Sequence, residues 1–221
     1  MDKRRIFEAL AEEEASVLLE LLDSAYDEMK VDQRNSVFGT YARSLPPEPV
    51  DGEALLIEIE IFRDHSLAGY YYKPFAINSK NWTYVPEKTK GWFEETGDYL
   101  KASRQLTVQG DHLHAVACFG ILYELIDAME NGEEIVFADE IGSWMIPGRE
   151  KEYIAAYMTS LAATMEPEQF TEAAIPMIRR DSWHSLAAQA YKSAISAADG
   201  EQRERLEAEV QRQEIRTERW W

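Results

Sequence analysis

Two histidines, His112 and His114, stand two residues apart directly after Gly110 and Asp111. Imidazole transfers protons near neutral pH and is a common zinc ligand. On a helix, however, side chains two positions apart diverge by about 200°, so these rings are not expected to share one metal. We interpret the segment as the first turn of a helix capped by Asp111. We predict no metal ligand set, no cofactor and no catalytic residue, since the chain carries no H-E-x-x-H, CxxC, EF-hand, phosphate-loop or nucleophile-elbow motif.

Four carboxylates gather in the segment 133–148, namely Glu133, Glu134, Asp139 and Glu140. Paired carboxylates can hold a hard cation or act as general acid and base, provided that burial or a neighbouring charge shifts a pKa. Asp139 and Glu140 are the better candidates for burial, because aromatic and aliphatic residues surround them. A metal-dependent or acid–base hydrolase using carboxylates of 133–140 is therefore the alternative function. The simpler interpretation is solvated loop charge.

Aromatic residues dominate the segment 70–85, YYYKPFAINSKNWTYV, which is the longest stretch without helical periodicity. Long irregular segments in compact domains are uncommon and often functional. Tyrosine and tryptophan combine a large apolar area with a polar tip, which suits interfaces. The candidate binding residues in and after this segment are Tyr71, Tyr72, Lys80, Trp82, Tyr84 and Trp92. In the competing interpretation, which we prefer, these rings fill a core layer between N-terminal and central helices, with some exposed in either case.

The helices that must position these candidate residues are predicted most clearly at residues 99–129. Apolar residues recur every three or four positions on both sides of Gly110-Asp111, which predicts two amphipathic helices. Glycine suits the left-handed position that ends a helix, and aspartate caps the next one. We therefore predict an antiparallel helical hairpin, which needs neighbours to cover its apolar faces.

The hairpin resembles a tetratricopeptide repeat, whose pattern runs W-x2-L-G-x2-Y, then A-x3-F, then P. In the first helix, Tyr99 stands at the tryptophan position, Ala102 and Ser103 at the leucine-glycine pair, and Leu106 at the tyrosine. In the second helix, Ala115 and Phe119 match A-x3-F. Asp127 stands where the pattern has its final proline. The resemblance covers about one repeat. It implies a tetratricopeptide-like αα-superhelix of stacked hairpins.

The remaining chain continues the helical pattern. We expect one all-α domain over 1–221, with hairpins at 1–69, an aromatic excursion at 70–85 and further hairpins at 86–221. Glu12 to Glu14 are expected to divide a helical stretch, Gly97-Asp98 to kink or break a helix, and Pro176 to kink or end one. Residues 55–62 fit a helix or an alternating strand, and we choose helix. Residues 133–148 are expected to form a second irregular excursion, with 135–137 as a possible strand-like piece.

Net charge and composition limit the kinds of partner that the protein is expected to bind. The formal net charge of −18 disfavours nucleic acid and anionic membranes as partners. One cysteine, Cys118, excludes an internal disulfide, and we expect it to be a small buried hydrophobe. No secretory signal or long apolar run is visible, which favours the cytoplasm. We expect a non-enzymatic scaffold that binds a protein or peptide, preferably basic, and the sequence sets no oligomeric state.

Overall fold

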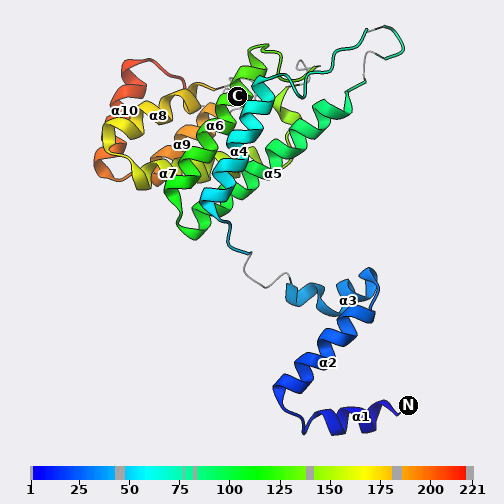
Figure 1. Ribbon diagram of the computed structural model, residues 1–221. Helices are drawn as coiled ribbons and strands as arrows, with labels where there is room; N and C mark the ends of the chain where they lie inside the picture. The colour runs from blue at the N-terminus through cyan, green and yellow to red at the C-terminus, as the bar shows by residue number, and fades with distance from the viewer. Residues whose placement is uncertain are drawn as a thin grey trace. The chain divides into compact units, whose positions relative to one another are not determined.

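The computed structural model describes residues 2–42, 48–76, 78–81, 84–137, 142–180 and 186–217. Within these ranges the chain forms ten α-helices, one short 3-10 helix and no strand (Figure 1). The predicted all-α class is therefore confirmed.

The chain divides into two compact units, Met1–Glu48 and Pro49–Trp221. The single domain expected from the sequence thus stays a prediction, and each unit is described by itself. The first unit contains α1 (Lys3–Leu10), α2 (Ala15–Glu28) and α3 (Val31–Ala42). The predicted break at the acidic triplet is confirmed, since α1 and α2 lie on either side of it.

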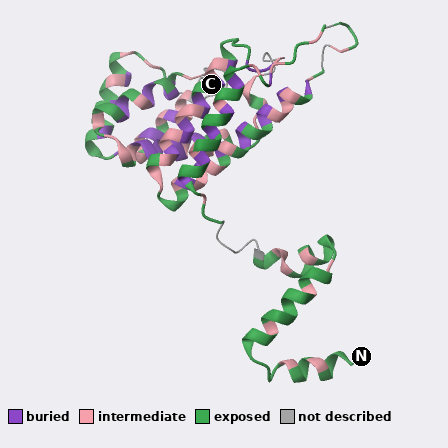
Figure 2. Ribbon diagram, viewed as in Figure 1, coloured by how far each residue is buried: buried purple, intermediate pink, exposed green. Residues whose placement is uncertain are grey.

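Arg34 joins α2 to α3. Its Nε donates to the carbonyl of Tyr26 at 2.8 Å and its Nη2 to that of Asp27 at 3.1 Å, which satisfies carbonyls at the end of α2. The rings of Tyr26 and Phe38 meet edge to face, with centroids 5.4 Å apart. Beyond these contacts the unit has little interior, because no residue of α1 or α2 is buried (Figure 2).

The second unit contains α4 (Gly52–Leu67), α5 (Glu87–Gln109), α6 (His112–Glu130), the 3-10 helix Ser143–Met145, α7 (Glu150–Thr164), α8 (Pro167–Arg179), α9 (Leu186–Ala197) and α10 (Gly200–Arg212). Helix α6 packs against α4, α5 and α7, and α7 also packs against α5, α8 and α9. The core therefore centres on α6 and α7, and Figure 2 shows the buried residues gathered on the inner faces of this unit.

Helices α5 and α6 form the predicted hairpin. Gly110 ends α5 in the left-handed region, at φ 88°. Its N–H donates to the carbonyl of Thr107, and the N–H of Asp111 donates to the carbonyl of Leu106. A residue with a β-carbon is strained in this conformation, so glycine is favoured at the turn. The Asp111 carboxylate then accepts from the N–H of His114 and caps α6.

The predicted kink or break at Gly97-Asp98 is wrong as a break, because α5 runs without interruption from Glu87 to Gln109. Its inner face is buried from Thr89 to Leu106. Packing of that face outweighs the modest helix-propensity cost of one glycine, about 1 kcal/mol.

Helix α4 settles the ambiguous segment 55–62 as helix, as chosen from the sequence. Leu55, Ile59 and Phe62 are buried, whereas Ile57 and Ile61 are each 51% exposed. The buried positions follow the period of a helix rather than that of a strand.

Helix α6 supplies the most apolar face of the unit. By length and composition alone its 19 residues would also suit a membrane span. Eight of its residues, Cys118 among them, are buried against neighbouring helices, and core burial accounts for their apolar character. The prediction that Cys118 is a buried hydrophobe is confirmed.

The segment 133–148 and the helix that contains Pro176 both differ from the sequence-based prediction. The described part of 133–148 contains turns and a 3-10 helix but no strand, so the strand-like piece at 135–137 is absent. Helix α8 extends through Pro176 to Arg179, so the early stop is wrong. Ile175, Met177 and Ile178 are buried around the proline, and their packing holds the last turn although Pro176 donates no hydrogen bond.

Candidate functional site

The aromatic segment begins where α4 ends. Gly69 adopts a φ of 71°, and its N–H donates to the backbone carbonyl of Ser66. The N–H of Tyr70 donates to the backbone carbonyl of His65. This pair of bonds is the Schellman motif, which reverses the chain direction through a glycine. The turn delivers Tyr70 and the residues after it to the end of the helical unit at which α5 begins.

Two of the candidate rings, Tyr71 and Trp92, lie in the core. Trp92 is fully buried and donates its indole N–H to Ser66 Oγ at 2.9 Å. Tyr71 donates its hydroxyl to Glu95 Oε2 at 2.7 Å, and burial together with this carboxylate raises the pKa of the phenol. Both rings pack against Phe62, so for these two residues the core interpretation holds.

Other rings remain partly open to solvent and form a cluster at the same end. Phe75 meets Tyr84 with centroids 5.4 Å apart and Phe137 at 5.1 Å, and Tyr72 meets Phe137 at 5.9 Å, all edge to face. Tyr84 is 51% exposed. We call Tyr70, Tyr72, Phe75, Tyr84 and Phe137 the aromatic surface. Lys80 is exposed on the same loop, and Trp82 lies outside the described residues.

A side chain of the protein already shows how a cation binds here. Lys88 Nζ lies 3.5 Å from the ring centroid of Tyr70, a cation–π contact.

The side chains of the asparagines in the loop form hydrogen bonds with the backbone of the loop itself. Asn78 Oδ1 accepts from the N–H of Lys80, and Asn81 Nδ2 donates to the carbonyl of Ala76, so they hold the loop rather than face a ligand.

The structure brings two of the four acidic candidates, Glu133 and Glu134, next to the aromatic segment. Thr89 Oγ1 donates to the carbonyl of Phe137 at 2.8 Å, which fastens the end of segment 133–137 to α5. The carbonyl oxygen of Glu134 lies next to Gly69, 3.9 Å from where a β-carbon on that glycine would lie, which is ordinary van der Waals contact. Glu133 and Glu134 are both exposed, and Asp139 and Glu140 lie outside the described residues. The sequence pointed to each group separately, and no pattern in it revealed that Phe137 would join them.

The histidines of α6 diverge, as expected. His112 Nδ1 lies 3.1 Å from Ser160 Oγ on α7, while His114 Nδ1 lies 2.9 Å from the carboxylate of Asp111. Ser160 is fully buried and also contacts Thr107, so it is closed to a substrate. No group of three or more His, Cys, Asp or Glu side chains with metal-binding geometry occurs in the described part of the chain.

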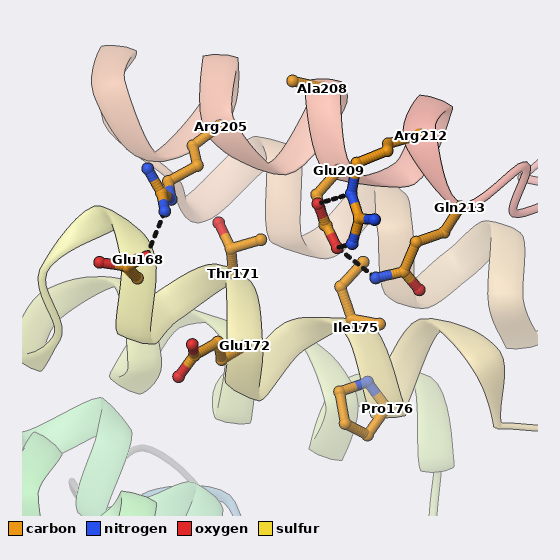
Figure 3. A pocket seen from close by; sticks show the side chains of 10 residues that line it. All are labelled: Glu168, Thr171, Glu172, Ile175, Pro176, Arg205, Ala208, Glu209, Arg212 and Gln213. Atoms are coloured by element: carbon orange, nitrogen blue, oxygen red, sulfur yellow. Dashed lines mark hydrogen bonds and ion pairs between the residues drawn. The ribbon is translucent and has the colours of Figure 1, made fainter.

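A charged groove of about 590 Å³ lies between α8 and α10 (Figure 3). Arg205 reaches across it to Glu168, and Glu209 accepts from Arg212 and Gln213. These bonds hold the pKa of Glu209 at about 2. Apart from Glu172, the charged side chains that line the groove are thus paired with one another, which makes it a weaker candidate than the aromatic surface.

A smaller cavity of about 230 Å³ lies beside Tyr123, Ile126, Trp144 and Tyr153. The Tyr123 hydroxyl is buried and has no hydrogen-bond partner among the described residues. Arg180 covers the ring of Tyr123, with Cζ 4.7 Å from the centroid, and pairs with Asp127 at 2.7 Å. The walls of the cavity combine apolar side chains with the polar groups of Tyr123, Ser143, Glu150 and Tyr153.

Comparisons with known protein families, with curated proteins and with solved structures found no match to this chain.

Proposed function

We propose that the protein is a non-enzymatic scaffold that binds basic protein or peptide segments on its aromatic surface. The observation that carries the proposal is a set of aromatic rings at one end of the helical unit, partly exposed and bordered by exposed carboxylates of Glu133 and Glu134. Rings held by contacts with one another are already ordered, so binding orders few side chains.

Charge supports a basic partner. Arginine and lysine bind over aromatic faces, as Lys88 does over Tyr70. The neighbouring carboxylates and the net charge of −18 attract cations and repel phosphate backbones. A peptide with a basic residue beside an apolar one would contact both kinds of group.

The arrangement of helices supports a stacked, tetratricopeptide-like framework for this surface. Helices contact the next-but-one helix as well as the next, in the pairs α4–α6, α5–α7, α7–α9 and α8–α10. Such two-layer contacts are those of stacked hairpins, and stacked hairpins present extended surfaces. Ser103 and Ala115, at small-residue positions of the repeat, are fully buried, as close helix contact requires.

Peptide selection tests the function. The full-length chain is immobilised, peptides are selected from a random display library, and the affinity of the enriched peptides is measured by fluorescence anisotropy. We expect enrichment of lysine and arginine. Tyr84→Ala should weaken binding by about 5- to 30-fold, the loss of an interface aromatic. Glu133→Gln with Glu134→Gln should mainly slow association and reduce its salt dependence.

The matched control is Val108→Ala, an exposed apolar residue near the other end of α5. It should leave the affinity unchanged. Selection of acidic peptides, or equal affinity of wild type and Tyr84→Ala, would contradict the proposed surface.

A further inference from the structure

The unit Met1–Glu48 displays far more apolar surface than it buries. Neither α1 nor α2 contains a buried residue, and Phe7 and Leu19 are 62% and 65% exposed. The other large apolar side chains exposed in this unit are Val17, Leu21, Leu22, Tyr26, Val31, Val37 and Tyr41. Figure 2 shows no buried position among the residues of its helices whose burial is described.

Such helices need a partner. They contain 8, 14 and 12 residues, and helices this short are marginal in water without tertiary packing. Arg34 and the contact of Tyr26 with Phe38 link α2 to α3, but nothing described within the unit covers the outer face of α1 and α2. Exposed apolar side chains gathered in this number on two short helices mark an interaction site.

The charges of the same segment indicate what that partner is. Lys3, Arg4 and Arg5 open α1, and Glu12, Glu13 and Glu14 follow its end. Three positive charges at one end and three negative charges at the other make the segment complementary to itself when two copies run antiparallel. A parallel pairing would place like charges together, which is unfavourable.

We propose that two copies of this chain associate through their Met1–Glu48 units, with the α1 helices antiparallel about a two-fold axis between Glu8 and Ala9. This arrangement brings the basic start of α1 near Glu12, Glu13 and Glu14 of the second copy, and Arg4 also pairs with Glu8 of its own helix at 3.0 Å. The same arrangement places Phe7 opposite Leu10, so apolar side chains meet between the two charged ends. A two-fold interface uses the same patch on both copies, and the exposed leucines of α2 extend it.

Charge swapping tests both the dimer and the antiparallel direction of its α1 helices. One variant carries Lys3→Glu, Arg4→Glu and Arg5→Glu, and the other carries Glu12→Lys, Glu13→Lys and Glu14→Lys. Mass is measured by light scattering after size exclusion, and by sedimentation over a dilution series, for the full-length chain. We expect wild type at twice the chain mass of 25.4 kDa, each swap alone at the single mass, and the mixture of both swaps at the doubled mass.

Apolar contacts are tested separately. Phe7→Glu should raise the dissociation constant of the dimer by at least about tenfold, whereas Val108→Glu, at an exposed apolar residue of α5, should leave it unchanged. Circular dichroism of each variant checks that α4 to α10 remain folded. Wild type at the single mass over the whole dilution series, or a mixture of the swaps that stays at the single mass, would overturn the proposal. Binding of a single-mass wild type to phosphatidylserine vesicles would overturn it in favour of a membrane surface.

Discussion

Gly97 and Gly91 lie six residues apart in α5 but face different surroundings. A β-carbon at Gly97 would lie 2.8 Å from Cδ and 2.9 Å from the carbonyl oxygen of Pro147. Gly97→Ala should therefore lower the free energy of unfolding by about 1–3 kcal/mol, because the Pro147 backbone must move. Urea denaturation measures the change.

The control is Gly91→Ala, where a β-carbon would meet nothing within 4 Å. Alanine has the higher helix propensity, so this variant should gain roughly 0.5–1 kcal/mol. A loss at both positions would show that the close approach to Pro147 is not the cause.

Residue types alone could not separate the rings of 70–93 into core and surface. The sequence presents Tyr71 and Tyr72 as equivalent neighbours, yet Tyr71 is 5% exposed and bonded to Glu95 whereas Tyr72 faces Phe137 at the rim. The direction in which the chain leaves Gly69 decides which ring turns inward. The burial of Tyr71 also needs its partners Glu95 on α5 and Phe62 on α4, and no local pattern specifies that these two side chains meet there.

At the scale of the helix, α10 caps α7. The Gln202 side chain is buried, and its Nε2 donates to the carbonyls of Ala162 at 3.0 Å and Met165 at 2.8 Å. Its Oε1 accepts from the N–H of Asp199 in a capping box. One side chain thus begins α10 and satisfies carbonyls at the end of α7.

Gln202→Ala should lower the free energy of unfolding by about 1–3 kcal/mol, because buried carbonyls lose their donor. Gln211→Ala, at an exposed position of the same helix, should change it little. Melting temperatures of both variants compare the two effects. Equal destabilisation would mean that the substitutions act through α10 alone.

Helix identity followed largely from the sequence, because apolar period and end signals are local. The hairpin at Gly110 and the division at Glu12 to Glu14 were predicted from such signals. The break at Gly97-Asp98 and the stop at Pro176 were wrong for one reason. Burial of the neighbouring residues holds each helix together, and the strength of that packing is a tertiary property.

The whole molecule should be sensitive to alkali. Burial raises the pKa of Tyr157 to about 12 and also raises those of Tyr71 and Tyr123. Unfolded phenols lose their protons near pH 10, at about the model-peptide value. Above that pH the unfolded chain binds fewer protons than the folded one, so stability falls as pH rises, by at most about 1.4 kcal/mol per pH unit for each phenol.

Absorbance at 295 nm and circular dichroism, followed together during alkaline titration, measure this loss. Ionisation of the buried phenols should coincide with loss of helical signal, and Tyr157→Phe should make the decline shallower. Complete phenol ionisation with the helical signal intact would contradict the prediction.

The sequence by itself determined the all-α class, most helix positions and the two segments that carry the aromatic and acidic candidates, because periodicity, capping and turn chemistry act over a few residues. Only the tertiary structure decided that Trp92 and Tyr71 are core, that Phe137 lies beside Tyr72 and Phe75, and that α1 and α2 bury no residue within their own unit. Those outcomes depend on which faces meet across long stretches of chain, and the free energy of such contacts is not written in any local pattern.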